Sequence, residues 1–180
     1  VTTTGKNKKE RIISAVKTLK DSLRLSLSMQ SMDQQVLENI RRENISASTM
    51  FDIMIDAKSV GLRTLSEVII GLPGDTFESV TNTIRTIFNI GVDNIQMYTL
   101  MLLEGSELNQ GEQREKWRFT TRWRLLARDF AELRSGARVL EVEEVVVSSS
   151  TLEYQEYLDL RDIALIVWIV SHGILFDPLL

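Results

Sequence analysis

Apolar positions recur with two different periods along residues 1–100, and these periods predict alternating helices and strands. A spacing of three to four residues predicts helices over 6–20, 31–42, 48–60 and 75–90. Strict alternation or a short apolar run predicts strands over 23–28, 65–70 and 92–100. Strands joined by long helical crossovers must run parallel, and helices cover such a sheet. The pattern therefore predicts an α/β fold.

Short polar motifs mark the expected helix ends. A hydroxyl residue followed three residues later by Gln or Glu fits a capping box at 31–34 and again at 150–153. Gly61 is expected to end the helix over 48–60 as a left-handed cap. Asp75 or Thr76 is expected to cap the next helix, which stops at Gly91. Three strands alone would leave an unpaired sheet edge, so the sequence predicts part of a larger sheet.

The pattern changes after Gly105. Basic and aromatic side chains are interleaved over 114–138, and the apolar ones recur at helical spacing. We therefore expect a helix that buries its aromatic side chains and turns its arginines toward water. A strand is predicted over 139–147, and the 14-residue apolar run at 163–176 predicts a buried helix, because it is too short to span a bilayer. The chain is thus divided into 1–110 and a C-terminal α+β extension over 111–180.

Composition narrows the possible functions. The 180 residues carry a net charge of −4, which argues against a general nucleic-acid binder. The absence of cysteine excludes disulfides, thiol catalysis, Cys-ligated zinc and a self-contained iron–sulfur site. No signal peptide is visible, which predicts a cytoplasmic protein without membrane contact. The chain begins with Val1 and not Met, so we expect it to be part of a longer protein.

Polar or glycine-rich sequence follows each predicted strand, where ligands of parallel α/β sheets bind. Gln30 could bind a ribose hydroxyl or an amide, or could simply face solvent. Gly71 permits close backbone approach, and the helix N-terminus after Gly74 could attract an anion. Glu67, in mid-strand, needs a partner such as an arginine. His172 has no ligand at metal spacing, so its role is expected to be structural and no metal site is predicted.

These segments together resemble the radical S-adenosylmethionine (radical SAM) superfamily. The matching segments are Gln30-Ser31, then 36–42, 67–76 (EVIIGLPGDT), 91–93 and 102–108 (LLEGSEL). The resemblance covers about residues 5–110. It is closest to the branch of oxygen-independent coproporphyrinogen oxidases, methylthiotransferases and cobalamin-binding radical SAM proteins. The resemblance implies the C-terminal half of a partial (βα)6 TIM-like barrel, with S-adenosylmethionine bound beside a 4Fe-4S cluster.

The resemblance also implies cofactor-binding roles for six residues. Gln30 and Glu67 match ribose-binding positions, Arg42 matches the arginine that binds the methionyl carboxylate, Ile69 and Met101 match positions beside the adenine, and Gly71 allows close backbone approach. Glu67 departs from the Asp found in some members, which puts its ribose role in doubt. No residue of this chain is expected to be catalytic.

The absence of cysteine is the main departure from the family pattern. Radical SAM clusters are held by a CxxxCxxC loop, so we expect these ligands in a missing N-terminal part of the same protein and no activity from this chain alone. A cobalamin domain could belong to the full-length protein. One alternative is a non-catalytic binding or scaffold domain, and another is part of an RNA-modifying enzyme that contacts RNA through 114–138. Exposed strand edges could also allow self-association. The substrate and reaction type are not predicted.

Overall fold

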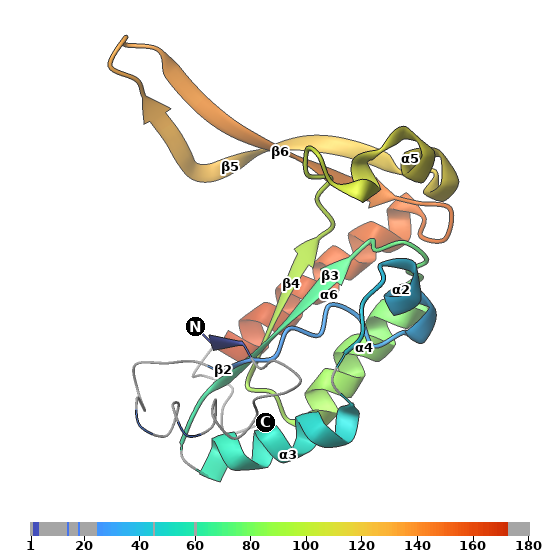
Figure 1. The fold of residues 1–180 in the computed structure, drawn as a ribbon, viewed down its shortest axis with the longest axis vertical. Coiled ribbons are helices and arrows are strands. Elements are labelled where there is room, and N and C mark those ends of the chain that lie inside the picture. Colours follow the sequence, from blue (N-terminus) through green and yellow to red (C-terminus); the bar gives the residue numbers. More distant parts are fainter. Residues whose placement is uncertain are drawn as a thin grey trace.

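The computed structural model describes residues 2–3, 14, 18, 25–44, 46–59 and 61–172. Its elements follow in this order (Figure 1): β1 (Thr2–Thr3), β2 (Leu25–Ser26), α2 (Gln34–Asn39), α3 (Ala47–Ser59), β3 (Thr64–Ile70), α4 (Phe77–Ile90), β4 (Asn94–Thr99), the short 3₁₀ turn η2 (Glu107–Asn109), α5 (Gly111–Trp117), β5 (Thr120–Glu132), β6 (Arg138–Ser148) and α6 (Tyr154–His172). The helix predicted over 6–20 lies outside the described residues except for Ser14 and Thr18, which are helical. The beginning of the strand predicted over 23–28 also lies outside them.

The first four strands form one parallel sheet in the order β1-β2-β3-β4. The longest pairing joins β3 to β4, from Leu65 opposite Asn94 to Ile70 opposite Thr99. Beyond the last paired residue of β2, Leu27 N–H still donates to the Leu65 carbonyl at 2.7 Å. The predicted α/β fold with a parallel sheet is confirmed.

One face of this sheet carries the core. Burial along β3 alternates strictly between fully buried and half-buried residues, because successive strand residues point to opposite faces. The buried set from the strands packs against α3, α4 and α6 (Figure 1). Its largest members are Leu25, Leu27, Met29, Ile70 and Ile95 from the strand segments, and Met50, Ile53, Met54, Ile87 and Leu160 from the helices. The other face of β3 carries the half-buried Leu65, Glu67 and Ile69.

Helix α4 begins and ends where the sequence predicts. Thr76 is its N-cap, and Thr76 and Ser79 form a reciprocal capping box. Gly91 ends the helix in the left-handed conformation, with φ of 86°.

Two predicted capping boxes are wrong. Helix α2 is capped by Asp33, whose Oδ1 accepts from Val36 N–H at 3.0 Å, while Ser31 Oγ accepts from Asp33 N–H. A carboxylate nearer the helix thus takes the position predicted for Ser31. Helix α6 begins at Tyr154, where the Glu156 carboxylate accepts from Glu153 N–H at 2.8 Å.

The apolar run in α6 is only partly buried, which corrects the prediction of a buried helix. Ile163, Ala164 and Val167 pack on the core, but Leu165, Ile166 and Trp168 are more than half exposed. A helix that lies on a sheet buries one side only, so a run that is apolar all round leaves the other side uncovered. Within the described residues, no helix is long and apolar enough to cross a membrane.

The segment 114–138 does not form the predicted helix. After α5 the chain enters β5, which pairs antiparallel with β6 in a hairpin that extends away from the parallel sheet (Figure 1). Trp123 and Phe130 are 66% and 74% exposed, where burial was predicted. The strand predicted over 139–147 is confirmed by β6, and pairing with this β-branched strand decides the conformation of β5.

The base of the hairpin contacts the end of the parallel sheet. Val146 N–H donates to the Leu100 carbonyl, and Leu102 N–H donates to the Glu144 carbonyl, both at 2.9 Å. Val145 and Val147 join the core beside α6, and Val146 packs with Leu72 and Leu100. The hairpin is therefore attached to the core by its base, whereas its outer part projects.

Candidate functional site

Polar side chains converge on the half-buried face of the sheet. Glu67 and Ile69 share this face of β3, opposite to Val68 and Ile70. In the register of β3 and β4, Glu67 lies beside Gln96, and Ile69 lies beside Tyr98. On the other side of β3, Ile69 N–H donates to the Gln30 carbonyl at 3.0 Å.

Ser28 links two of the residues predicted to bind cofactor. Its hydroxyl donates to Glu67 Oε2 at 2.6 Å. Its carbonyl accepts from Arg42 Nη2 at 3.0 Å. The structure therefore brings Arg42 and Glu67 together around Ser28. The hydrogen-bond partner of Glu67 is the Ser28 hydroxyl, whereas an arginine was one of the partners expected from the sequence.

The Arg42 guanidinium has a donor left over. Its Nε is buried and has no hydrogen-bond partner among the described residues. An unpaired buried donor costs about 1 to 3 kcal/mol, more in a charged group, so such a group is favourable to an incoming acceptor. A ligand carboxylate is the acceptor that best fits a guanidinium. Asn44, which donates to the Ser31 carbonyl at 2.6 Å, also has a buried Oδ1 without a partner.

Tyr98 faces Glu67 from the neighbouring strand. Burial, together with the charge of Glu67 and hydrogen bonding to it, raises the pKa of Tyr98 above its ordinary value of 10.0. The phenol is therefore protonated at neutral pH and can donate, while the carboxylate accepts.

Ser28 and Tyr98 were both missed from the sequence. They stand on the polar side of alternating strand residues, Ser28 two positions before Gln30 and Tyr98 two positions after Gln96. Strand alternation was the signal that could have identified them.

Gly71 and Met101 have other neighbours. Gly71 has φ of 89°, which favours glycine, and its N–H donates to Asp75 Oδ2 at 3.1 Å. Met101 follows β4, forms an isolated bridge with Val145 at the hairpin base, and is partly exposed. No contact described here joins either residue to Arg42 or Glu67, so their cofactor roles stay predictions.

The turn after β3 is held by its own carboxylate. Asp75 is 1% exposed, and its Oδ2 also accepts from Leu72 N–H at 2.9 Å, while Ser79 donates to Oδ1 at 3.3 Å. Burial raises the pKa of Asp75 from 3.8 to about 7, although these hydrogen bonds oppose the rise. Because Thr76 Oγ1 accepts from Ser79 N–H, side chains of this chain cap the helix end that was predicted to attract an anion.

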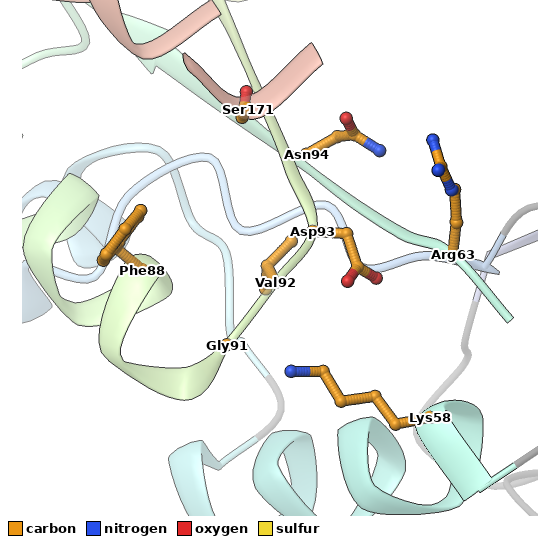
Figure 2. Close-up of a pocket in the computed structure, with 8 residues that line it drawn as sticks. All are labelled: Lys58, Arg63, Phe88, Gly91, Val92, Asp93, Asn94 and Ser171. Atoms are coloured by element: carbon orange, nitrogen blue, oxygen red, sulfur yellow. The ribbon is translucent and has the colours of Figure 1, made fainter. Parts of the chain in front are cut away.

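A cavity of about 340 Å³ lies at the opposite end of the strands (Figure 2). Lys58, Arg63 and Asp93 are among its lining residues, and Figure 2 shows Lys58 reaching toward Gly91. The Asp93 carboxylate accepts from the amide and the hydroxyl of Thr64, at 2.7 and 2.6 Å. Ligands of parallel α/β sheets bind at the carboxyl ends of the strands, so this cavity at the amino ends is not the candidate site.

Comparison with known proteins identifies the relatives of this chain. No family model matches it. It is 31% identical over 121 residues to the cobalamin-dependent radical SAM methyltransferase TokK of Streptomyces tokunonensis. The aligned segment covers 65% of this chain and 18% of TokK. It is 30% identical over 113 residues to the 2-(S-pantetheinyl)-carbapenam-3-carboxylate methyltransferase of Streptantibioticus cattleyicolor, which covers 61% of this chain and 17% of that enzyme. The chain is a relative of radical SAM proteins.

A solved structure supports the fold of this radical SAM relative. The radical SAM methyltransferase TsrM from Kitasatospora setae superposes with a TM-score of 0.57 over 88% of this chain and 34% of TsrM, at 12% identity. The chain matches less than a fifth of the length of the two curated relatives. The resemblance predicted from the sequence is confirmed at the level of the superfamily.

The described part of the chain offers no ligand set for a metal cluster. Among the described residues, no group of three His, Cys, Asp or Glu side chains could hold a metal ion. The whole sequence contains no cysteine. The residues present therefore do not fit a thiolate-ligated 4Fe-4S cluster.

Proposed function

We propose that this chain is the part of a radical SAM protein that binds S-adenosylmethionine. In this proposal, residues 1–110 form the C-terminal half of a partial (βα)6 barrel, and 111–180 form an extension to it. The relationship to radical SAM methyltransferases and the parallel sheet support the proposal.

The observation that carries the proposal is the buried Arg42 Nε without a partner, on the same serine as Glu67. A sulfonium nucleoside with an amino-acid tail offers a carboxylate for Arg42 and ribose hydroxyls for Glu67 and Gln30. Ile69 offers an apolar surface to the adenine, and the same role is proposed for Met101. Bound S-adenosylmethionine would supply the methyl or adenosyl group of the reaction, while these residues bind and orient it.

We propose no cluster chemistry for this chain. A 4Fe-4S cluster would need ligands from outside it, so the 180-residue chain alone is expected to be inactive. Cobalamin belongs to the name of TokK, and no residue described here is assigned to it.

The arginines of 114–138 do not favour the RNA-contacting alternative. Arg114 pairs with Glu144 at 2.5 Å, and Arg124 pairs with Glu143. These two guanidinium groups are used within the hairpin and its base, which supports the proposal that RNA is not a ligand of this surface.

Calorimetric titration of the chain with S-adenosylmethionine tests the proposal. Arg42→Ala and Gln30→Ala are compared with Arg85→Ala and Gln155→Ala, which change exposed residues of α4 and α6. A charge-assisted hydrogen bond contributes about 1.5 to 3 kcal/mol, so Arg42→Ala should raise the Kd by about tenfold to a hundredfold. Gln30→Ala should raise it by about threefold to tenfold, and the controls should leave it unchanged.

Two results would contradict the proposal. One is an Arg42→Ala variant that binds as tightly as Arg85→Ala. The other is a wild-type chain that folds, as judged by circular dichroism, and binds no S-adenosylmethionine. Formation of 5′-deoxyadenosine by the chain with a reductant would contradict the expected inactivity.

A further inference from the structure

We propose that Ser28 and Tyr98 are positioning residues that hold the Glu67 carboxylate from the chain segments on either side of β3 and couple it to Arg42. The inference deepens the proposed function and rests on it. It concerns how the two charged groups of the site are kept in place, which nothing in the comparisons assigns.

The contacts of Ser28 carry the first step. A carboxylate only accepts, so the 2.6 Å contact fixes Ser28 as the donor to Glu67 Oε2. The same residue's carbonyl accepts from Arg42 Nη2. A shift of the backbone at Ser28 would therefore move both the hydroxyl that binds Glu67 and the carbonyl that binds Arg42. Ser28 occupies only part of the carboxylate, which leaves acceptor sites on Glu67 for a ligand's hydroxyl groups.

The register of the sheet carries the second step. Ser28 belongs to the segment on one side of β3, and Tyr98 belongs to β4 on the other side. Glu67, on β3, thus has the Ser28 hydroxyl 2.6 Å from its Oε2 on one flank, and on the other flank the Tyr98 phenol, whose pKa the Glu67 charge helps to raise. A free glutamate side chain loses about 1.5 to 2 kcal/mol of rotamer entropy when a ligand fixes it. A side chain that Ser28 and Tyr98 already restrain would lose less, so both residues should increase affinity without touching the ligand.

Titration with two ligands separates positioning from general damage. Ser28→Ala and Tyr98→Phe are tested in the full 180-residue chain with S-adenosylmethionine and with 5′-methylthioadenosine, which lacks the amino-acid tail. Each variant should weaken both ligands by about threefold to tenfold, since one lost hydrogen bond is worth about 0.5 to 1.5 kcal/mol. Arg42→Ala should weaken S-adenosylmethionine more than 5′-methylthioadenosine, because only the former has the carboxylate that Arg42 is proposed to bind.

Matched controls and a rescue complete the design. Ser59→Ala and Tyr154→Phe change exposed residues far along the chain and should leave both affinities unchanged. Ser28→Thr retains a hydroxyl and should restore most of the affinity. In the Ser28→Ala/Glu67→Gln double variant the losses should be less than additive, because both changes remove one coupled contact.

The ultraviolet titration of Tyr98 provides a readout that needs no ligand. Glu67→Gln removes the negative charge beside the phenol, so the pKa of Tyr98 should fall toward its ordinary value, with Tyr98→Phe identifying its signal. An unchanged pKa would overturn the Tyr98 contact.

The two ideas can fail separately. If Arg42→Ala weakens S-adenosylmethionine binding but Ser28→Ala and Tyr98→Phe behave like the controls, the positioning role is wrong and the proposed function stands. If the folded wild-type chain binds neither ligand, the proposed function fails and the positioning role fails with it.

Discussion

The parallel sheet and the β5–β6 hairpin both contain apolar strand residues, but these residues are buried in the sheet and largely exposed in the outer part of the hairpin. Val68 and Ile70 of β3 are each 1% exposed beneath α4 and its neighbours, whereas Leu125 of β5 is 64% exposed. The change occurs even within β6, whose outer residues are exposed while Val145–Val147 at its base are buried. Burial in this protein therefore depends on which elements pack over a strand and not on how apolar the strand is.

The two regions also hold their buried carboxylates differently. Asp75, next to the parallel sheet, accepts from backbone N–H groups and a hydroxyl. Glu144, at the hairpin base, accepts from Arg114 and Thr121. Burial alone would raise the pKa of Glu144, but the hydrogen bonds from Arg114 and Thr121 and the charge of Arg114 hold it below its ordinary value. The pKa values of the two carboxyls thus move in opposite directions.

The largest difference should come from truncating one leucine in each region. Leu160→Ala in α6 removes a fully buried side chain and should lower the free energy of unfolding by about 2 to 5 kcal/mol. Leu125→Ala, the matched change in the hairpin, should lower it by less than about 0.5 kcal/mol. Urea denaturation measures both. Equal losses of unfolding free energy in the two variants would show that Leu125 is buried in solution, and the contrast between sheet and hairpin would then be wrong.

The next effect concerns Asp75. Asp75→Ala leaves the buried amides of Gly71 and Leu72 without their acceptor and should cost about 1 to 3 kcal/mol, while the Ser79 hydroxyl can still donate to the Thr76 carbonyl. Asp75→Asn should cost less, because its amide oxygen can still accept from Gly71 and Leu72 and its NH₂ can donate to Ser79.

The same pair of variants predicts a pH dependence. Between about pH 4 and pH 7, folded Asp75 holds a proton that the unfolded chain has lost, so its contribution lowers the free energy of unfolding as pH rises. Chemical denaturation across this range should show that the free energy of unfolding of the wild type falls with rising pH, and that this dependence is weaker in Asp75→Asn. A slope that Asp75→Asn leaves unchanged would contradict this assignment.

The smallest effect concerns the ion pairs of the hairpin. Arg114→Ala removes the partner of the nearly buried Glu144 carboxylate and should cost about 1 kcal/mol. Arg138→Ala, whose 3.7 Å pair with Glu132 is exposed, should cost less than about 0.5 kcal/mol. Because the pKa of folded Glu144 is lowered, the contribution of its pair is present above the ordinary pKa of 4.5 and is lost as the pH falls. Denaturation at pH 7 and at acidic pH measures the loss of unfolding free energy in each variant. A loss in Arg114→Ala that grows as the pH falls would contradict the predicted direction of this pH dependence.

The sequence predicted the elements whose signals are local. The ends of α4 follow from Thr76 and Gly91, because capping residues act within one helical turn. The conformation of 120–132 could not be predicted in this way, since apolar residues at helical spacing became a strand through pairing with β6. The exposure of Trp168, at 51%, has a similar origin, because the apolar run predicts a helix correctly but does not indicate which of its sides packs on the core.

The candidate site shows the same division. Gln30, Arg42 and Glu67 were identified through a family resemblance carried by short motifs. Alternation could have marked Ser28 and Tyr98 as polar strand positions, but only the structure places them on either side of Glu67. Sequence spacing does not indicate which strand neighbours which, so a contact across three strands is not encoded in any one segment.

The sequence by itself determined the alternation of helix and strand, the parallel direction of the first strands, the superfamily and the absence of cysteine ligands. These properties depend on residue types and on periods within single segments. The tertiary structure alone decided which apolar faces are covered, which carboxylates are paired, and that one serine joins Arg42 to Glu67. These properties depend on long-range packing and strand register, which bring residues from distant parts of the chain into contact.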